Sequence, residues 1–236
     1  MSAEAMRVGA IVWKDLTAER RTKANFNSVA FLAALILLLF GFALGPDTQA
    51  LRNVAGGVLW LTVLFSGVLS FNRSYEQELE NGSLEMLLLY PGDRRSIFVG
   101  KLIANLVFVL LMEAVLIPLA AVLYDIPIWR VIGPLAIVLF LGTLGFVTLG
   151  TFYSAMASRL RAREVLLPLL LFPMLIPLLI AAVQATGLIL TGDLMVRDAA
   201  AGATVALSSS WVRVLVVFDI VFLTGALFAF EHVIED

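Results

Sequence analysis

The sequence predicts an all-α integral membrane protein with six transmembrane helices and an N-terminal interfacial helix. Of its 236 residues, 61% are hydrophobic and 14% are charged, whereas soluble domains carry roughly 45–50% apolar and about 25% charged residues. The apolar residues also gather in runs of about 20, the length that an α-helix needs to cross a bilayer. A soluble fold would have to bury almost every one of these helices on all sides, so the sequence argues against one.

The N-terminal segment, residues 7–23, predicts a short helix that lies along the cytoplasmic membrane interface. Val8, Ile11, Val12 and Leu16 share one face of this helix, and most of its charged residues lie elsewhere. The charges follow the apolar part, which is the reverse of the order in a signal peptide. A plain soluble tail is the alternative for this segment.

Six spans are expected in a single transmembrane domain that covers residues 1–236. The first ends at Gly45-Pro46, because glycine and proline both interrupt helices. One long polar connection, residues 73–97, separates the second span from the third, and a Gly/Ala/Ser-rich loop, residues 191–207, precedes the sixth. The spans are expected at about 28–45, 53–72, 98–123, 131–156, 165–190 and 211–230.

The distribution of positive charge predicts the orientation of the chain in the membrane. Short loops rich in Lys and Arg stay in the cytoplasm. If both termini are cytoplasmic, the outer side holds only Arg52, Arg130, Arg197 and Arg213. The inner side then holds twelve of the sixteen positive residues: Arg7, Lys14, Arg20, Arg21, Lys23, Arg73, Arg94, Arg95, Lys101, Arg159, Arg161 and Arg163. We therefore expect a multi-pass inner-membrane protein with both termini in the cytoplasm.

The sequence shows no motif for catalysis or for nucleotide binding. It contains no GxxxxGK[ST] loop and no HExxH or GxSxG pattern. It has no cysteine and one histidine, His232, so disulfides and thiolate metal sites are excluded. We predict no catalytic residue, no metal site and no cofactor bound by this chain. If the protein uses ATP, a separate chain must hydrolyse it.

The polar connection at residues 73–97 is the candidate functional segment. An acidic, helix-prone stretch there can end at Asn81-Gly82, because both residues tolerate a left-handed conformation. Ser83 can then cap a new short helix with an acid in its first turn and a leucine face. Such an element suits a groove on a partner ATPase, although a solvated connector without a partner is the alternative. The residues predicted to dock are Tyr75, Glu76, Glu80, Asn81, Gly82, Ser83, Leu84, Glu85 and Leu88.

The same segment carries a resemblance to a known family. Asn81-Gly82-Ser83-Leu84-Glu85, followed by Leu87, Leu88, Pro91 and Lys101, is similar to the loop after the second span in the heme exporter protein B family. A second similar block comprises Leu144-Gly145-Phe146, Arg163 and residues 165–180. The likeness covers the first five spans and their loops. Asn81 stands where the family usually has an acid.

The resemblance implies the membrane domain of a type-2 ABC exporter, acting as the permease subunit of the cytochrome c maturation system. It implies a homodimer with two copies of a cytoplasmic ABC ATPase, beside a heme-handling membrane subunit and a periplasmic heme chaperone. ATP, bound on the partner, would drive heme export or the release of the heme-loaded chaperone. A general type-2 exporter permease for a drug or glycan, and a non-transporting membrane scaffold, stay open as alternatives; an intramembrane enzyme lacks any catalytic pairing.

Several residues within the spans are candidates for a path through the bundle. Glu113 and Asp219 fall inside the membrane, where an ionisable side chain costs roughly 2.5–3.5 kcal/mol and so faces protein or water. They either line a polar path or bond to a neighbouring helix. The fifth span is expected to be kinked at Pro168, Pro173 and Pro177, either as part of a path or hinge or for packing alone.

Small residues in the fourth span predict a close helix contact. Gly142 and Gly150 flank Phe146 on one helical face. Glycines at such spacings let helices approach closely, either within the chain or between two copies in a dimer.

Overall fold

The computed structural model describes residues 3–22, 24–80, 95–158, 163–191, 195–197 and 204–233. Within these ranges the chain consists of helices, the short turns that join them and one short hairpin, which confirms the predicted fold class. The helices are α1 (Ala3–Thr22), α2 (Ala24–Leu44), α3 (Thr48–Glu80), α5 (Arg95–Leu123), α6 (Ile132–Ser158), α7 (Arg163–Thr191) and α8 (Leu207–Val233), with a 3₁₀ turn η1 (Ile128–Arg130) and strands β1 (Met195–Arg197) and β2 (Thr204–Ala206).

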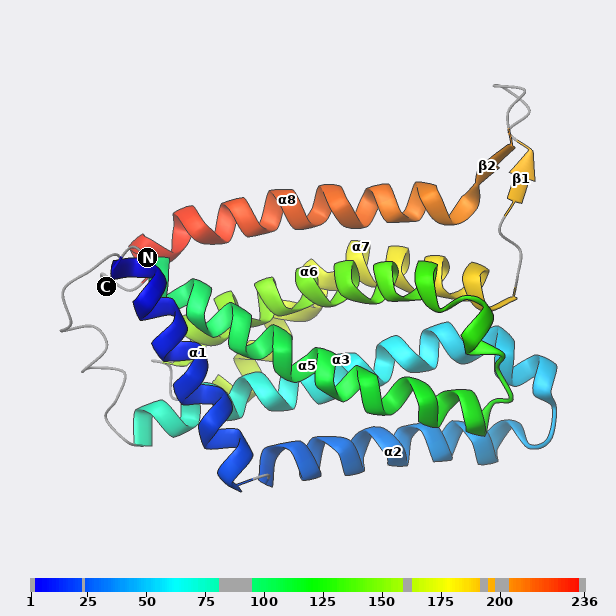
Figure 1. Ribbon diagram of the computed structural model, residues 1–236, viewed down its shortest axis with the longest axis horizontal. Coiled ribbons are helices and arrows are strands. Elements are labelled where there is room, and N and C mark those ends of the chain that lie inside the picture. Colours follow the sequence, from blue (N-terminus) through cyan, green and yellow to red (C-terminus); the bar gives the residue numbers. More distant parts are fainter. Residues whose placement is uncertain are drawn as a thin grey trace.

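Six of these helices are long and apolar enough to cross a membrane. They run alongside one another as a bundle, and α1 lies obliquely across one end of it (Figure 1). The spans that qualify are Phe26–Leu44, Thr48–Phe71, Arg95–Leu123, Ile132–Ala157, Leu166–Thr191 and Ser210–Phe230, which coincide with the six apolar stretches of the sequence. The protein is a multi-pass membrane protein.

The helix at the centre of the bundle is α3. In its most apolar window 72% of the residues are buried by the rest of the chain, compared with 17% in α2 and 22% in α8. The latter two helices form opposite sides of the bundle in Figure 1, and their outward faces carry large apolar side chains such as Phe42 and Ile220. Apolar residues on these faces suit contact with lipid.

The contact between α3 and α6 is built from aromatic rings seated on glycines. A Cβ atom added to Gly142 would lie 2.2 Å from the ring of Trp60, and one added to Gly150 would lie 2.1 Å from the ring of Phe71. In the opposite direction, the ring of Phe146 occupies the space beside Gly67. The predicted close contact at Gly142 and Gly150 is therefore confirmed, and it lies within one chain.

Tryptophans mark the two ends of the bundle. Trp13 of α1 is 71% exposed at one end, and Trp129 of η1 is 84% exposed at the other. Tryptophan prefers the level of the lipid headgroups, because its ring is apolar and its N–H is polar. Trp60, by contrast, lies in the core and donates its indole N–H to Thr186 Oγ1 at 2.9 Å.

The apolar part of α3 ends at Phe71, next to the predicted end of the second span at residue 72, and the helix continues to Glu80 through the acidic stretch that the sequence predicts to be helix-prone. The structure differs from the sequence prediction in the connection before the sixth span. The loop at residues 191–207 contains an antiparallel hairpin, in which Val196 pairs with Val205. Its β-branched residues favour strand, but the Gly/Ala/Ser-rich composition of the loop hid this signal.

Candidate functional site

The predicted docking segment leaves the bundle at the end where α1 lies. The segment, residues 73–97, begins within the last turns of α3 and ends within the first turn of α5. Both of these helix ends lie at this end of the bundle together with the end of α8 (Figure 1). Tyr75, Glu76 and Glu80 belong to the last turns of α3, but their side chains are outside the part of the chain that the structure describes. Docking stays a prediction, because the other docking residues also fall outside that part: Asn81, Gly82, Ser83, Leu84, Glu85 and Leu88.

The start of α5, directly after this segment, is anchored to the end of α8. The guanidinium carbon of Arg95 lies 5.3 Å from the centre of the Phe228 ring. One turn further on, the rings of Phe98 and Phe230 pack with their centres 5.0 Å apart. A cation above an aromatic face and a buried ring pair each stabilise a contact by roughly 0.5–1.5 kcal/mol. The segment therefore leads into a helix that is held firmly at its first turns.

A buried lysine in α5 is the main site feature that sequence reasoning missed. Lys101 is 1% exposed, and its Nζ lies 2.9 Å from Oδ2 of Asp15 in α1. From the sequence, Lys101 is one of the inner positive charges and belongs to the block that resembles the family, but its burial and its partner were not predicted. The available signal was a lysine set in an apolar run, which requires a buried partner; the sequence does not say which of the acids supplies it.

The first intramembrane carboxylate, Glu113 of α5, is bonded to a neighbouring helix. Thr143 of α6 donates its hydroxyl to Glu113 Oε1, and both residues are buried. The carboxyl borders a cavity of about 10 Å³ between α2, α3 and α5, beside Ser66 and Val29. That volume holds about one water molecule. Of the two interpretations that the sequence left open, the structure supports the helix-to-helix bond.

The second intramembrane carboxylate, Asp219 of α8, is also buried but has a different environment. Neither of its oxygens has a hydrogen-bond partner within the described part of the chain. A Cβ atom added to Gly145 of α6 would lie 2.5 Å from Asp219 Oδ1, and Phe218 and Leu178 border the same spot. Glu113 and Asp219 thus reach α6 within two residues of each other, from α5 and from α8. Among the described residues no three His, Cys, Asp or Glu side chains gather to hold a metal ion.

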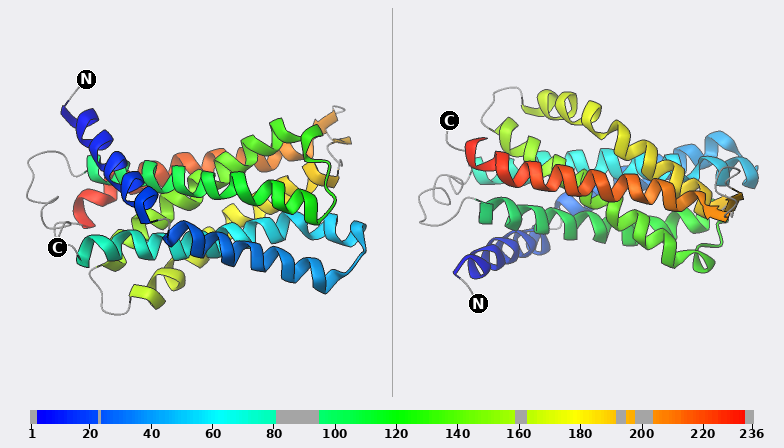
Figure 2. Two further views of the ribbon diagram at one scale, coloured as in Figure 1. Left: turned by 60° about the horizontal axis from the view of Figure 1, so that its bottom comes forward. Right: turned by 90° about the horizontal axis from the view of Figure 1, so that it is seen from above.

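The three prolines of the fifth span all lie inside the uninterrupted helix α7. Pro173 and Pro177 are exposed on its outer face, whereas Pro168 is half-buried. The helix α7 lies on the flank of the bundle opposite to α1 (Figure 2). A kink that works as a path or hinge stays a prediction. His232 lies in the last turn of α8, and its side chain is outside the described residues.

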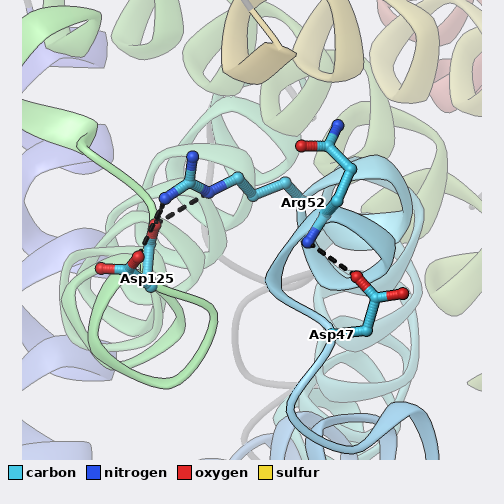
Figure 3. Close-up of polar contacts among 4 residues, drawn as sticks. Asp47, Arg52 and Asp125 are labelled. Carbon is cyan, nitrogen blue, oxygen red and sulfur yellow. Dashed lines mark hydrogen bonds and ion pairs between the residues drawn. The ribbon is translucent and has the colours of Figure 1, made fainter.

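The opposite end of the bundle is tied together by polar contacts that the sequence did not predict. Arg52 of α3 donates from Nε to the backbone oxygen of Asp125 at 2.9 Å, and its Nη2 lies 2.9 Å from Asp125 Oδ2 (Figure 3). Asp47 caps the start of α3 by accepting the backbone N–H of Gln49 and Ala50 at 3.1 and 3.0 Å. The contact of Arg52 holds the loop after α5 against α3, and the bonds of Asp47 fix the start of α3.

These features define a polytopic helical membrane protein with polar contacts at both ends of the bundle and a few buried ones between its helices. The family model described as "CcmB protein" matches residues 6–236, and the chain belongs to this family. It is 31% identical to heme exporter protein B of Rhodobacter capsulatus over 207 residues, which are 84% of this chain and 93% of the relative. It is 32% identical to heme exporter protein B of Haemophilus influenzae over 183 residues, 75% of this chain and 81% of the relative.

A third relative, heme exporter protein B of Paracoccus denitrificans, is 30% identical over 198 residues, covering 82% of this chain and 84% of its own length. The resemblance inferred from the docking segment is therefore confirmed at the level of the family. As a member, the chain is a non-catalytic permease subunit.

Proposed function

We propose that this chain is the membrane subunit of the transporter for cytochrome c maturation. It couples ATP hydrolysis by a separate cytoplasmic ABC ATPase to heme export or to the release of a heme-loaded periplasmic chaperone. The observation that carries the proposal is the family match over residues 6–236 in a chain that lacks a nucleotide-binding motif. Its relatives bear the name heme exporter protein B, which makes heme the proposed cargo.

The arrangement of the helices supports the position of the ATPase. The end of α3, the start of α5, the end of α8 and the helix α1 share one end of the bundle (Figure 1). The positive residues of the sequence concentrate in the segments at this end, which favours the cytoplasm. An ATPase that binds residues 73–97 would therefore contact the end of the bundle that α3, α5 and α8 form. On this proposal both termini are cytoplasmic and the hairpin β1–β2 is periplasmic.

On this proposal the bundle also has partners within the membrane. A second copy of this chain and the heme-handling membrane subunit are the two candidates, and the periplasmic heme chaperone would act at the end that carries η1. The buried carboxylates Glu113 and Asp219 lie inside the chain, and the bond of Glu113 to Thr143 favours a structural role for that residue over a place in a heme path.

Replacement of two docking residues tests the proposal. Gly82→Pro with Glu85→Lys should abolish co-purification of the ATPase, because the first change removes the conformational freedom at the turn and the second reverses the charge of the docking helix. Trp129→Ala, at the opposite end, is the control and should leave co-purification unchanged. Undiminished co-purification of the double variant, together with normal cytochrome c assembly, contradicts the docking segment.

Cargo is tested separately with a reconstituted complex in lipid vesicles. Movement of heme, or release of the heme-loaded chaperone, that requires ATP turnover supports the proposal. ATP turnover without either movement contradicts it.

A further inference from the structure

We propose that α1 is a brace for the docking segment, and that the buried pair of Asp15 and Lys101 fixes this brace to α5. This inference rests on the proposed function and deepens it, because it names positioning residues through which the ATPase acts on the bundle. Neither residue touches the ATPase in this scheme. They hold α1 and the first turns of α5 as one unit, so that a displacement of the docking segment moves both.

The burial of Lys101 is the first support. Its side chain is 2% exposed, whereas that of Asp15 is 19% exposed, and the two charged groups lie 2.9 Å apart. Taking charges out of water costs several kcal/mol per ion, and a lysine buried at this depth is tolerated only with a well-placed partner. A helix that merely covered α5 would do so at lower cost with an apolar residue. The pair therefore specifies one position of α1 on α5.

The packing beside the pair specifies the same position. Ile11 lies one helical turn before Asp15 on α1, and Gly100 directly precedes Lys101 on α5. A Cβ atom added to Gly100 would lie 2.9 Å from Cβ and Cγ2 of Ile11, which is 3% exposed. An isoleucine seated on a glycine and a charge pair in the next turn make a contact that resists both sliding and rotation.

A second acid on the same face of α1 reaches a second span. Glu19, four residues after Asp15, accepts the backbone N–H of Phe26 at 2.8 Å through its Oε1. Phe26 is in the first turn of α2, where free N–H groups attract a carboxylate. The face of α1 that carries Asp15 and Glu19 thus contacts α5 and α2 at the same end of the bundle.

The position of the pair along α5 connects it with the docking segment. Lys101 lies six residues after Arg95, the first residue of α5, which corresponds to about 9 Å along the helix. Since a helix is stiff over this length, a displacement where the docking segment ends reaches Lys101 nearly undiminished. The contacts of Arg95 and Phe98 with α8 lie in the same two turns. Asp15 therefore contacts α5 close to the point at which a displacement of the docking segment by the ATPase would reach the transmembrane helices.

The variant Lys101→Met tests the brace. Methionine has nearly the same length and suits a buried site, and Asp15 keeps access to solvent, so we expect the chain to fold and to bind the ATPase. The ATP hydrolysis that depends on the membrane subunit should fall about 2- to 30-fold, which corresponds to coupling energies of about 0.5–2 kcal/mol. Lys14→Met removes a charge next to Asp15 and keeps the pair with Lys101; it should keep the wild-type rate.

A disulfide between α1 and α5 tests whether fixing the two helices to each other restores the coupled ATPase rate. The chain has no cysteine, so Ile11→Cys with Gly100→Cys creates a single possible bridge. Its Cβ atoms start 2.9 Å apart, and the two helices must separate slightly to reach the roughly 3.5–4.5 Å of a disulfide. In the Lys101→Met background, oxidation of the purified complex should restore the coupled ATPase rate, and reductant should abolish it again. If Lys101→Met does not fold, Asp15→Leu with Lys101→Met replaces it, because an apolar pair removes the charges together.

The outcomes are distinct. A wild-type rate in Lys101→Met, or a bridge that forms without restoring the rate, overturns the brace. A bridged chain with native Lys101 that loses the coupled rate also overturns it, because α1 would then have to move along α5. Failure of the unaltered chain to bind the ATPase at all counts against the proposed function instead.

Discussion

Replacing Gly142 with alanine should destabilise the bundle, because the indole of Trp60 already fills the space beside this glycine. The new Cβ would lie 2.2 Å from the ring, whereas ordinary contacts begin at 3.4 Å, so the ring or the helix must shift by about 1 Å. Trp60 cannot turn away freely, since its N–H is bonded to Thr186 at 2.9 Å. Overpacking costs about 1–3 kcal/mol, and loss of the bond adds about 0.5–1.5 kcal/mol.

The matched control is Gly225→Ala in α8, where a Cβ atom meets nothing within 4 Å. Both substitutions gain the higher helix propensity of alanine, up to about 1 kcal/mol, so this gain cancels in their difference. We expect the two variants to differ by about 2–4 kcal/mol, or about 4–16 °C in Tm for a chain of this length. Thermal unfolding in detergent, followed by size-exclusion chromatography of the soluble fraction, measures it. Equal Tm values for the two variants would refute the packing of α3 on α6.

Three further predictions concern polar side chains. Thr143→Val should lower the stability by about 1–3 kcal/mol, because it leaves the buried carboxyl of Glu113 without its donor, while Thr143→Ser should keep most of it; a valine variant as stable as wild type in the same melting assay would contradict the bond. Asp219→Leu should raise the Tm, because a buried carboxyl without a partner costs about 1–3 kcal/mol; a lower Tm would mean that Asp219 has a partner. Arg52→Gln should cost only about 0–1 kcal/mol, since its contact with Asp125 is exposed, but it should increase proteolysis of the loop after α5, and an unchanged cleavage rate would count against the contact.

The six spans could be predicted because each is specified locally. An apolar run of about 20 residues is sufficient to define a membrane helix, and no distant residue has to be known. The end of α2 follows equally from a near neighbour, Gly45, whose φ of +66° suits glycine. The start of α3 at Thr48 precedes the predicted start of the span at residue 53, because Asp47 caps the helix there. The continuation of α3 to Glu80 could also be predicted, because the acidic residues after the span favour helix.

The polar contacts could not be predicted, because each joins residues that are far apart in the chain. Thr143 is 30 residues from Glu113, and Arg52 is 73 residues from Asp125. A buried lysine and two intramembrane acids need partners, but many residues qualify. Nothing in the sequence indicates that Lys101 pairs with Asp15, or that Glu113 accepts a hydrogen bond from Thr143. The docking segment is the opposite case, because it is supported by the sequence pattern and the family match and not by the structure. Residues 81–94 lie outside the described structure.

The central claim is that residues 73–97 face the cytoplasm and bind the ATPase. The absence of cysteine allows a direct measurement, in which Glu85→Cys and Trp129→Cys are labelled in intact cells and in inverted vesicles with a membrane-impermeant maleimide. We predict that the thiol at position 85 reacts only in inverted vesicles and becomes protected when the ATPase is bound, whereas the thiol at position 129 reacts only in intact cells. Labelling of position 85 from outside intact cells would contradict the account.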